Sequence, residues 1–161
     1  MFVLTGRRRS EVMNLTVSDI EPGEPAFYTY RGKGGKRGRR ELPNPAYVAI
    51  VQALSAFGRG LMAMDPSDSI WPTSAHTGGV SSGSVYANFR RYLAIAGLPP
   101  AGLHLLRHTA AKLRRDAGQS VEDVSQVLDH SSLQVTSVYL RRLEGEGDIG
   151  WSPVASAIGA V

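Results

Sequence analysis

A short basic turn rich in glycine, set between two strand-like segments, is the feature that most limits how this chain can fold. Residues 27–30 are aromatic and β-prone, and residues 39–42 have extended character up to Pro43. The segment between them, residues 32–38, alternates glycine with lysine and arginine, which favours a turn. The pattern predicts a β-hairpin with a strongly cationic tip, and the fold must therefore contain a small antiparallel sheet.

Most of the remaining chain has helical spacing of its apolar residues. Ser10 and Ser120 are candidate N-caps, Pro45 suits the first turn of a helix and Gly118 suits a C-cap. The predicted helices are residues 10–15, 45–57, 85–95, 103–117, 120–128 and 132–139. Residues 64–84 read as surface loop. We therefore expect a mainly α fold with a small antiparallel β-hairpin, in the α+β class.

The aromatic residues and the remaining histidines receive structural interpretations. Phe27, Tyr28 and Tyr30 are expected to form the buried and half-buried faces of the hairpin. We also expect four aromatic side chains to pack in the core: Trp71, Tyr86, Phe89 and Tyr92. Glu11 is interpreted as a structural residue that supports an arginine, and His76 and His108 receive no catalytic role.

Length and composition indicate one domain of ordinary solubility. The chain has 161 residues, of which 42% are hydrophobic, and a mean hydropathy of −0.14. It contains no apolar run long enough to span a bilayer and no secretory signal pattern at its N-terminus, so we expect a cytoplasmic protein. The absence of cysteine excludes thiolate chemistry and leaves Ser, Thr, Tyr, Lys or a carboxylate for any covalent step.

Positive charge is concentrated near the N-terminus. Lysine and arginine number 18 against 14 acidic residues, and nine of those 18 cations lie in the first 40 positions. The only acids in that stretch are Glu11, Asp19, Glu21 and Glu24. A basic face of this kind is typical of a protein with a polyanionic partner.

His104 and Arg107 stand three positions apart on a predicted helix, so both side chains can reach one anionic group. Such a pair alone is more often a solvated or capping arrangement. The chain adds further elements in a fixed order: arginines at positions 7–9 before a helix, Lys33 in the hairpin tip, His130, and Tyr139 nine residues after that histidine. Together with the His104–Arg107 pair, these are six elements in a fixed order, which favours a functional site over a solvated pair.

This order resembles the tyrosine recombinases of the phage integrase family. The chain carries T-G-x-R-x-S-E followed by a hydrophobic residue, a G-K-G turn, H-x-x-R-H-T, and H-S-S with a tyrosine beyond it. The resemblance runs from Leu4 to about Leu140 and implies the catalytic-domain fold of those enzymes. It implies six catalytic residues: Arg8, Lys33, His104, Arg107, His130 and Tyr139.

The resemblance also implies a reaction. Tyr139 would attack a DNA phosphodiester while the two arginines neutralise the phosphate oxygens and the histidines donate hydrogen bonds or shuttle the proton. Lys33 would protonate the departing 5′-oxygen, with Lys36 as the nearest alternative. The product is a 3′-phosphotyrosyl link that another strand can reverse, so the resemblance implies a DNA recombinase without metal, cofactor or ATP. A type IB topoisomerase-like enzyme and a truncated, inactive DNA-binding fragment are the alternatives.

The implied partner is double-stranded DNA, bound by a homotetramer and without a membrane. Residues expected to contact phosphates are Arg31, Lys36, Arg37, Arg39 and Arg40. We expect the catalytic domain to cover residues 1–143 and a linker with a small tail to cover 144–161. That tail would dock either on its own chain or on a neighbour. The N-terminal core-binding domain usual in the family is expected to be absent from this sequence.

Two positions depart from the family pattern. Asp129 stands where a glycine usually precedes the second histidine, and Arg7 and Arg9 are charged where the first motif usually has apolar or neutral residues. The register of Ser10 and Glu11 favours Arg8 as the catalytic arginine. Asp129 adds a negative charge beside the phosphate site, which would raise the pKa of His130 or slow the reaction.

Overall fold

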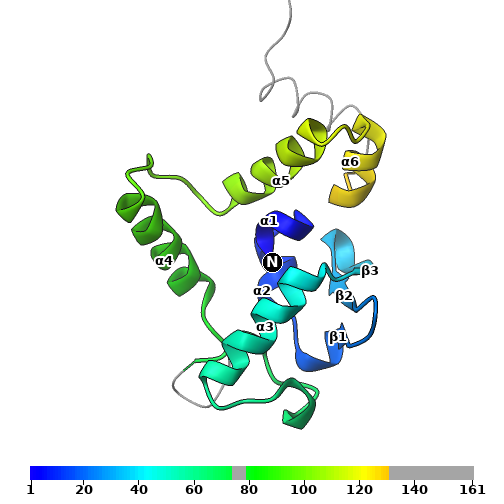
Figure 1. Ribbon diagram of the computed structural model, residues 1–161, viewed down its shortest axis with the longest axis vertical. Coiled ribbons are helices and arrows are strands. Elements are labelled where there is room, and N and C mark those ends of the chain that lie inside the picture. Colours follow the sequence, from blue (N-terminus) through cyan, green and yellow to red (C-terminus); the bar gives the residue numbers. More distant parts are fainter. Residues whose placement is uncertain (74–78, 131–161) are drawn as a thin grey trace, which may run out of the picture. The chain divides into compact units, whose positions relative to one another are not determined.

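The computed structural model describes residues 1–73 and 79–130 (Figure 1). The chain divides into two compact units, Met1–Ala111 and Lys112–Val161. The first unit holds the whole sheet and most of the helices, and the boundary between the units falls within a helix. None of the helices in the described part of the chain has the length and hydropathy needed to span a bilayer.

The described residues are mainly helical, as predicted. The helices are α1 (Phe2–Thr5), α2 (Arg9–Met13), α3 (Asn44–Ala56), α4 (Ser82–Ile95), α5 (His104–Asp116) and α6 (Val121–Leu128). Short 3₁₀ turns are η1 (Val17–Asp19), η2 (Lys33–Gly35) and η3 (Leu61–Ala63). The helix predicted for residues 132–139 and the tail at 144–161 lie outside the described residues.

The predicted hairpin is confirmed and carries a third, very short strand. β1 (Ile20–Glu21), β2 (Phe27–Arg31) and β3 (Arg37–Glu41) form an antiparallel sheet in that order. The tip is closed by a hydrogen bond of 2.7 Å from the Gly32 N–H to the Lys36 carbonyl. Gly34 and Gly35 have φ values of 73° and 76°, a left-handed backbone that glycine adopts without strain.

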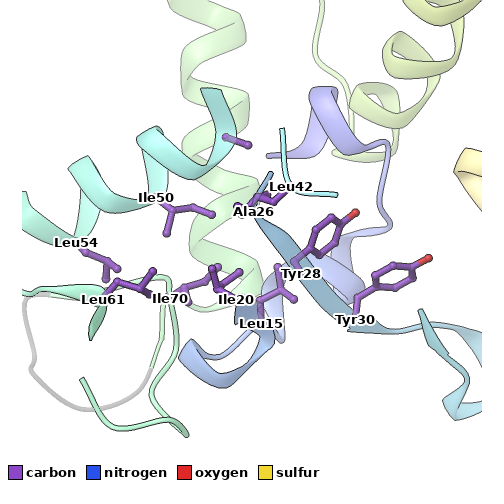
Figure 2. Close-up of a cluster of buried hydrophobic side chains, with 11 residues drawn as sticks. Leu15, Ile20, Ala26, Tyr28, Tyr30, Leu42, Ile50, Leu54, Leu61 and Ile70 are labelled. Atoms are coloured by element: carbon purple, nitrogen blue, oxygen red, sulfur yellow. The ribbon is translucent and has the colours of Figure 1, made fainter. Parts of the chain in front are cut away.

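One cluster of buried side chains forms the core of the first unit. α3 contributes Ala46, Ile50 and Leu54, which pack against the sheet and the loops after it (Figure 2). Tyr28 and Tyr30 are 1% and 4% exposed and project side by side from β2 (Figure 2), as expected for the buried face of the hairpin. Burial of this apolar surface is what holds the sheet and α3 together.

Side-chain hydrogen bonds start α2 and α4 at residues other than those predicted, whereas the cap of α6 is as predicted. α2 begins at Arg9 with Arg8 as its N-cap, because the Glu11 carboxylate accepts the Arg8 N–H at 2.8 Å; Ser10 is therefore not the cap. α4 begins at Ser82, earlier than predicted, because the Ser81 hydroxyl accepts the Ser84 N–H at 3.0 Å. Ser120 caps α6 as predicted.

The core prediction was wrong for two aromatic residues of α4. Tyr86 is 38% and Tyr92 is 59% exposed, whereas Trp71 packs against the core as expected. α4 supplies only Leu93 to the buried hydrophobic set of the described residues. The space over the sheet is already filled by α3, and a tyrosine tolerates exposure because its hydroxyl remains hydrated.

Candidate active site

The backbone of the first arginine motif is held in a tight turn at the end of α1. Gly6 caps that helix with φ 64° and ψ 14°, a left-handed conformation that favours glycine, and its N–H donates to the Phe2 carbonyl at 2.9 Å. The Thr5 hydroxyl donates to the Met1 carbonyl at 3.0 Å and accepts the Arg7 N–H at 3.3 Å. The threonine and glycine therefore fix the direction in which the arginines leave the turn.

Glu11 holds Arg8 at both its backbone and its side chain. Besides accepting the Arg8 N–H, the carboxylate forms an ion pair with the Arg8 Nη1 at 2.8 Å. The Glu11 side chain is 1% exposed and that of Arg8 is 35% exposed. A buried carboxylate requires such partners, and its position restricts the rotamers of the arginine. The interpretation of Glu11 as support for an arginine is confirmed.

Arg107 on α5 is anchored to the same turn. Its side chain is buried, with 2% of the residue exposed, and its Nη1 donates to the Gly6 carbonyl at 2.7 Å. A buried guanidinium gains stability from hydrogen bonds to backbone carbonyls, which replace lost water. This bond brings together two motifs that are 101 residues apart in the sequence.

A pocket of about 340 Å³ opens between these elements of the first unit. Its lining residues are Arg7, Arg8, Arg9, Tyr86, Gly102, Leu103, His104 and Arg107. The structure thus brings together three of the predicted catalytic residues, Arg8, His104 and Arg107. Tyr86 was missed as a pocket residue because the spacing of a helix does not show which aromatic side chain faces a site. No group of three or more His, Asp or Glu side chains suited to a metal ion occurs in residues 1–73 and 79–130.

The pocket favours anions and keeps its histidine neutral. Although His104 is exposed, partial desolvation and then the charges of Arg107 and Arg8 lower its pKa. The ring of His108 meets that of His104 edge-on, with 4.9 Å between the centroids. Burial, His104 and Arg107 lower the pKa of His108 in turn. These shifts favour the neutral form of both rings, in which each ring can donate through one nitrogen and accept through the other.

Lys33 and the other hairpin cations lie around the tip of the sheet. The backbone of Lys33 lies in η2, and Arg31 faces Arg37 directly across the strands. Arg31, Lys36, Arg37 and Arg39 are exposed, while Arg40 is partly buried opposite Tyr28. Arg31, Lys36 and Arg37 give the hairpin a basic surface near its tip.

Arg39 is paired with an acidic side chain of β1. Its Nη2 lies 2.7 Å from a Glu21 carboxylate oxygen, and its guanidinium carbon lies 3.9 Å from the Phe27 ring centroid. The hydrogen bond from Arg39 lowers the pKa of Glu21. The positive charge of Arg39 is therefore largely balanced before any anion binds.

Asp129 and His130 follow α6 in the second unit. Asp129 is the C-cap of that helix with φ 50° and ψ 47°, a left-handed conformation, and it is the one non-glycine residue of the described chain with positive φ. The His130 N–H donates to the Ser125 carbonyl at 3.1 Å. The family's usual glycine at this position has a direct physical reason, since glycine adopts this backbone without strain. Tyr139 lies outside the described residues.

The described fold is that of an α+β domain built on a small antiparallel sheet, with an arginine-lined pocket beside it. Tyrosine recombinase catalytic domains share this fold, as the solved structures below show. The chain belongs to the phage integrase family, whose model matches residues 1–146.

Among curated proteins, similar sequences are tyrosine recombinases. The chain is 30% identical over 144 residues to tyrosine recombinase XerD of Rhizobium meliloti, an alignment that covers 87% of this chain and 44% of that protein. It is 31% identical over 140 residues to tyrosine recombinase XerA of Pyrococcus furiosus, covering 85% and 46%. The chain therefore spans less than half the length of these relatives.

Solved structures of recombinases share the fold. A crystal structure of XerA recombinase superposes with a TM-score of 0.70 at 23% identity, covering 97% of this chain and 53% of that one. XerH recombinase bound to its difH substrate, in a pre-cleavage complex, gives a TM-score of 0.69 at 23% identity, covering 89% and 42%. The predicted fold class is confirmed by both.

Proposed function

We propose that this chain is the catalytic domain of a site-specific DNA recombinase that cleaves and rejoins strands through a 3′-phosphotyrosyl intermediate. The observation that carries the proposal is the hydrogen bond from Arg107 to Gly6, because it gathers Arg8, His104 and Arg107 around one pocket. The similarity to proteins named tyrosine recombinases supports the same conclusion. We propose Arg8, Lys33, His104, Arg107, His130 and Tyr139 as the catalytic residues.

Arg8 and Arg107 would bind the non-bridging oxygens of the scissile phosphate. Both guanidiniums present N–H groups in a fixed plane that matches phosphate geometry. Glu11 and the Gly6 carbonyl hold them before substrate arrives, so little reorganisation is needed as charge develops in the transition state. The arginines thus neutralise the negative charge of the phosphate oxygens, which the reaction requires with any leaving group.

Proton transfer would come from the neutral histidines and from Lys33. A tyrosine has an ordinary pKa of about 10, so Tyr139 needs a base and nearby positive charge to attack as a phenolate. A neutral His104 can accept a hydrogen bond or a proton within the arginine-lined pocket. Lys33 would protonate the departing 5′-oxygen. These residues supply the whole reaction without a metal ion or ATP.

The substrate we propose is double-stranded DNA. XerH was solved bound to difH, and lambda integrase was solved as a dimer bound to a COC′ core site. For this chain, the exposed cations of the hairpin would contact phosphates on either side of the scissile one. We further propose that the chain works as a homotetramer on DNA, with residues 144–161 docking on a neighbouring copy.

Nicked suicide duplexes, drawn from a pool randomised around the nick, test this function. Cleavage beside a nick releases a short strand, so the protein stays covalently attached and the adduct survives SDS. We expect the unaltered chain to form such an adduct and Tyr139→Phe to form none. Relaxation of supercoiled plasmid without strand exchange would favour a topoisomerase-like enzyme, and the absence of any adduct would favour an inactive DNA-binding fragment.

A further inference from the structure

Arg7 and Tyr30 form a buried contact that joins the first arginine motif to the hairpin. The guanidinium carbon of Arg7 lies 4.3 Å from the centroid of the Tyr30 ring. The two residues are 2% and 4% exposed, and a cation over an aromatic ring is held most strongly when both are shielded from water.

The Tyr30 ring in turn spans both strands of the hairpin. It projects from β2 beside Tyr28 (Figure 2) and lies across Gly38, its partner in β3. A Cβ atom at position 38 would stand 2.4 Å from the Cζ and the Oη of Tyr30, so only glycine leaves the ring where it is. A displacement of the Tyr30 ring would therefore shift both β2 and β3.

The backbone of the hairpin tip also lies near the carboxylate that holds Arg8. A Cβ atom at Gly32 would stand 3.9 Å from the Oε1 of Glu11, the same oxygen that pairs with the Arg8 Nη1 at 2.8 Å. Gly32 directly precedes Lys33, and Tyr30 stands three residues before it. The first arginine motif therefore contacts the hairpin at Tyr30 and lies near it at Gly32, and both positions are within three residues of Lys33 in the sequence.

We propose that Arg7 and Tyr30 are positioning residues for Lys33. They fix the hairpin from which Lys33 extends relative to the phosphate that Arg8 binds. In the step concerned, Tyr139 gives its phenolic proton to a neutral histidine and its oxygen bonds to phosphorus. The bond from phosphorus to the 5′-oxygen breaks, and a Lys33 proton passes to that oxygen. The inference rests on the proposed recombinase function and adds two residues to it.

A 5′-sulfur at the scissile phosphate separates positioning of the acid from every other role. A thiolate leaves without a proton, because thiols are far stronger acids than alcohols, so a defect confined to proton donation disappears on that substrate. The substrate is a nicked duplex recovered from the randomised pool for adduct formation by the unaltered chain, made with 5′-oxygen and with 5′-sulfur. The variants are Tyr30→Leu, Arg7→Met and, as a reference, Lys33→Ala, all in the full chain.

We expect Lys33→Ala to slow adduct formation about 10²- to 10⁴-fold on the oxygen duplex and to recover on the sulfur duplex. For Tyr30→Leu and Arg7→Met, the rate of adduct formation on the oxygen duplex should fall about 10- to 100-fold, as expected for a displaced catalytic group. On the sulfur duplex, their rates should recover in the same way as that of Lys33→Ala. Tyr30→Phe keeps the ring and should stay within about threefold of the unaltered chain on both, since the ring contact is retained.

Two results would contradict the positioning role of Arg7 and Tyr30 or the proposed function on which it rests. If Arg7→Met and Tyr30→Leu fold, as judged by circular dichroism, but lose the same factor on both duplexes, they act on the phosphate or on stability and the inference is wrong. Should Tyr30→Leu fail to fold, Arg7→Met alone decides by the same comparison. A chain that forms no adduct on any member of the pool overturns the proposed function itself, which is a different result from unrescued variants of an active chain.

Discussion

The Nη1 of Arg107 lies 2.7 Å from the carbonyl oxygen of Gly6, and this bond connects the two arginine motifs of the site. Gly6 ends α1 in a left-handed conformation. Arg107 is buried where its side chain contacts the Gly6 carbonyl. Arg8 follows two residues later and is held by Glu11. The positions of both guanidiniums therefore depend on one turn of the chain.

Replacing Arg107 with lysine should remove the bond to Gly6 while keeping the charge. We expect the free energy of unfolding to fall by about 1.5–3 kcal/mol, the worth of a hydrogen bond to a charged group. Adduct formation should fall by about 10²- to 10³-fold, as for loss of a preorganised donor. Urea denaturation and the suicide-duplex assay measure the two effects, with the exposed Arg90→Lys as a matched control that changes neither.

Glu11→Gln should weaken the site through Arg8. The amide keeps the shape of the carboxylate but loses the charge that pairs with the Arg8 Nη1 at 2.8 Å. We expect a loss of about 1–3 kcal/mol in the free energy of unfolding, together with slower adduct formation. Exchange of the exposed Glu122 for Gln serves as the control. An active, fully stable Glu11→Gln would show that Arg8 is not positioned by this pair.

Asp129→Gly should relieve strain and speed the reaction. Glycine adopts φ 50° freely, whereas Asp costs about 1 kcal/mol in a left-handed conformation, partly offset by the greater freedom of glycine when unfolded. Asp129→Asn keeps the backbone preference and removes only the charge. If the carboxylate opposes reaction at the phosphate, both variants react faster, and only the glycine variant shows a change in Tm from relieved strain. Equal rates in all three proteins would exclude any effect of this charge.

Stability should fall as the pH drops through the ordinary pKa of histidine. Desolvation, Arg107 and Arg8 lower the pKa of His104 in the folded state, so the unfolded chain binds the proton more readily near pH 6.5. His108 acts in the same direction. Thermal melts between about pH 8 and pH 5.5, the range in which an ordinary histidine titrates, should show a falling Tm, with a shallower slope in His104→Gln. A slope unchanged by that substitution would contradict the site electrostatics.

Two hairpin arginines should contribute differently to DNA binding. Arg37 is exposed and faces another cation, Arg31, whereas Arg39 is paired with Glu21 at 2.7 Å. A neutralising substitution at a phosphate contact lowers the salt dependence of binding by about one unit of slope. We expect Arg37→Gln to approach that change and Arg39→Gln to fall well short of it. Binding titrations over a range of salt concentrations measure both, and equal losses would argue against the Glu21 pairing.

The sequence predicted the hairpin, most of the helices and three of the residues that line the pocket, Arg8, His104 and Arg107. It did so because these features depend on local signals: glycine spacing in residues 32–38, apolar periodicity, and the i, i+3 placement of His104 and Arg107. The prediction failed where the outcome depends on packing. The exposure of Tyr86 and Tyr92 follows from α3 already covering the sheet, which no local pattern of α4 contains.

The contacts of the first arginine motif were also beyond the sequence. Three consecutive arginines look alike as a string, yet Arg7 is buried against Tyr30, Arg8 is paired with Glu11 and Arg9 is exposed. Their roles separate only when α2 and the hairpin are placed together. The preference for Arg8 as catalytic, drawn from its register with Glu11, remains a prediction.

Mapping the attachment point of DNA tests the central claim most directly. The adduct formed on a nicked duplex is digested with trypsin and nuclease, and the peptide that carries the nucleotide remnant is identified by mass spectrometry. We predict that the remnant sits on Tyr139. A remnant on Tyr86, the tyrosine that lines the pocket, would contradict the proposed nucleophile, and so would an adduct that persists in Tyr139→Phe.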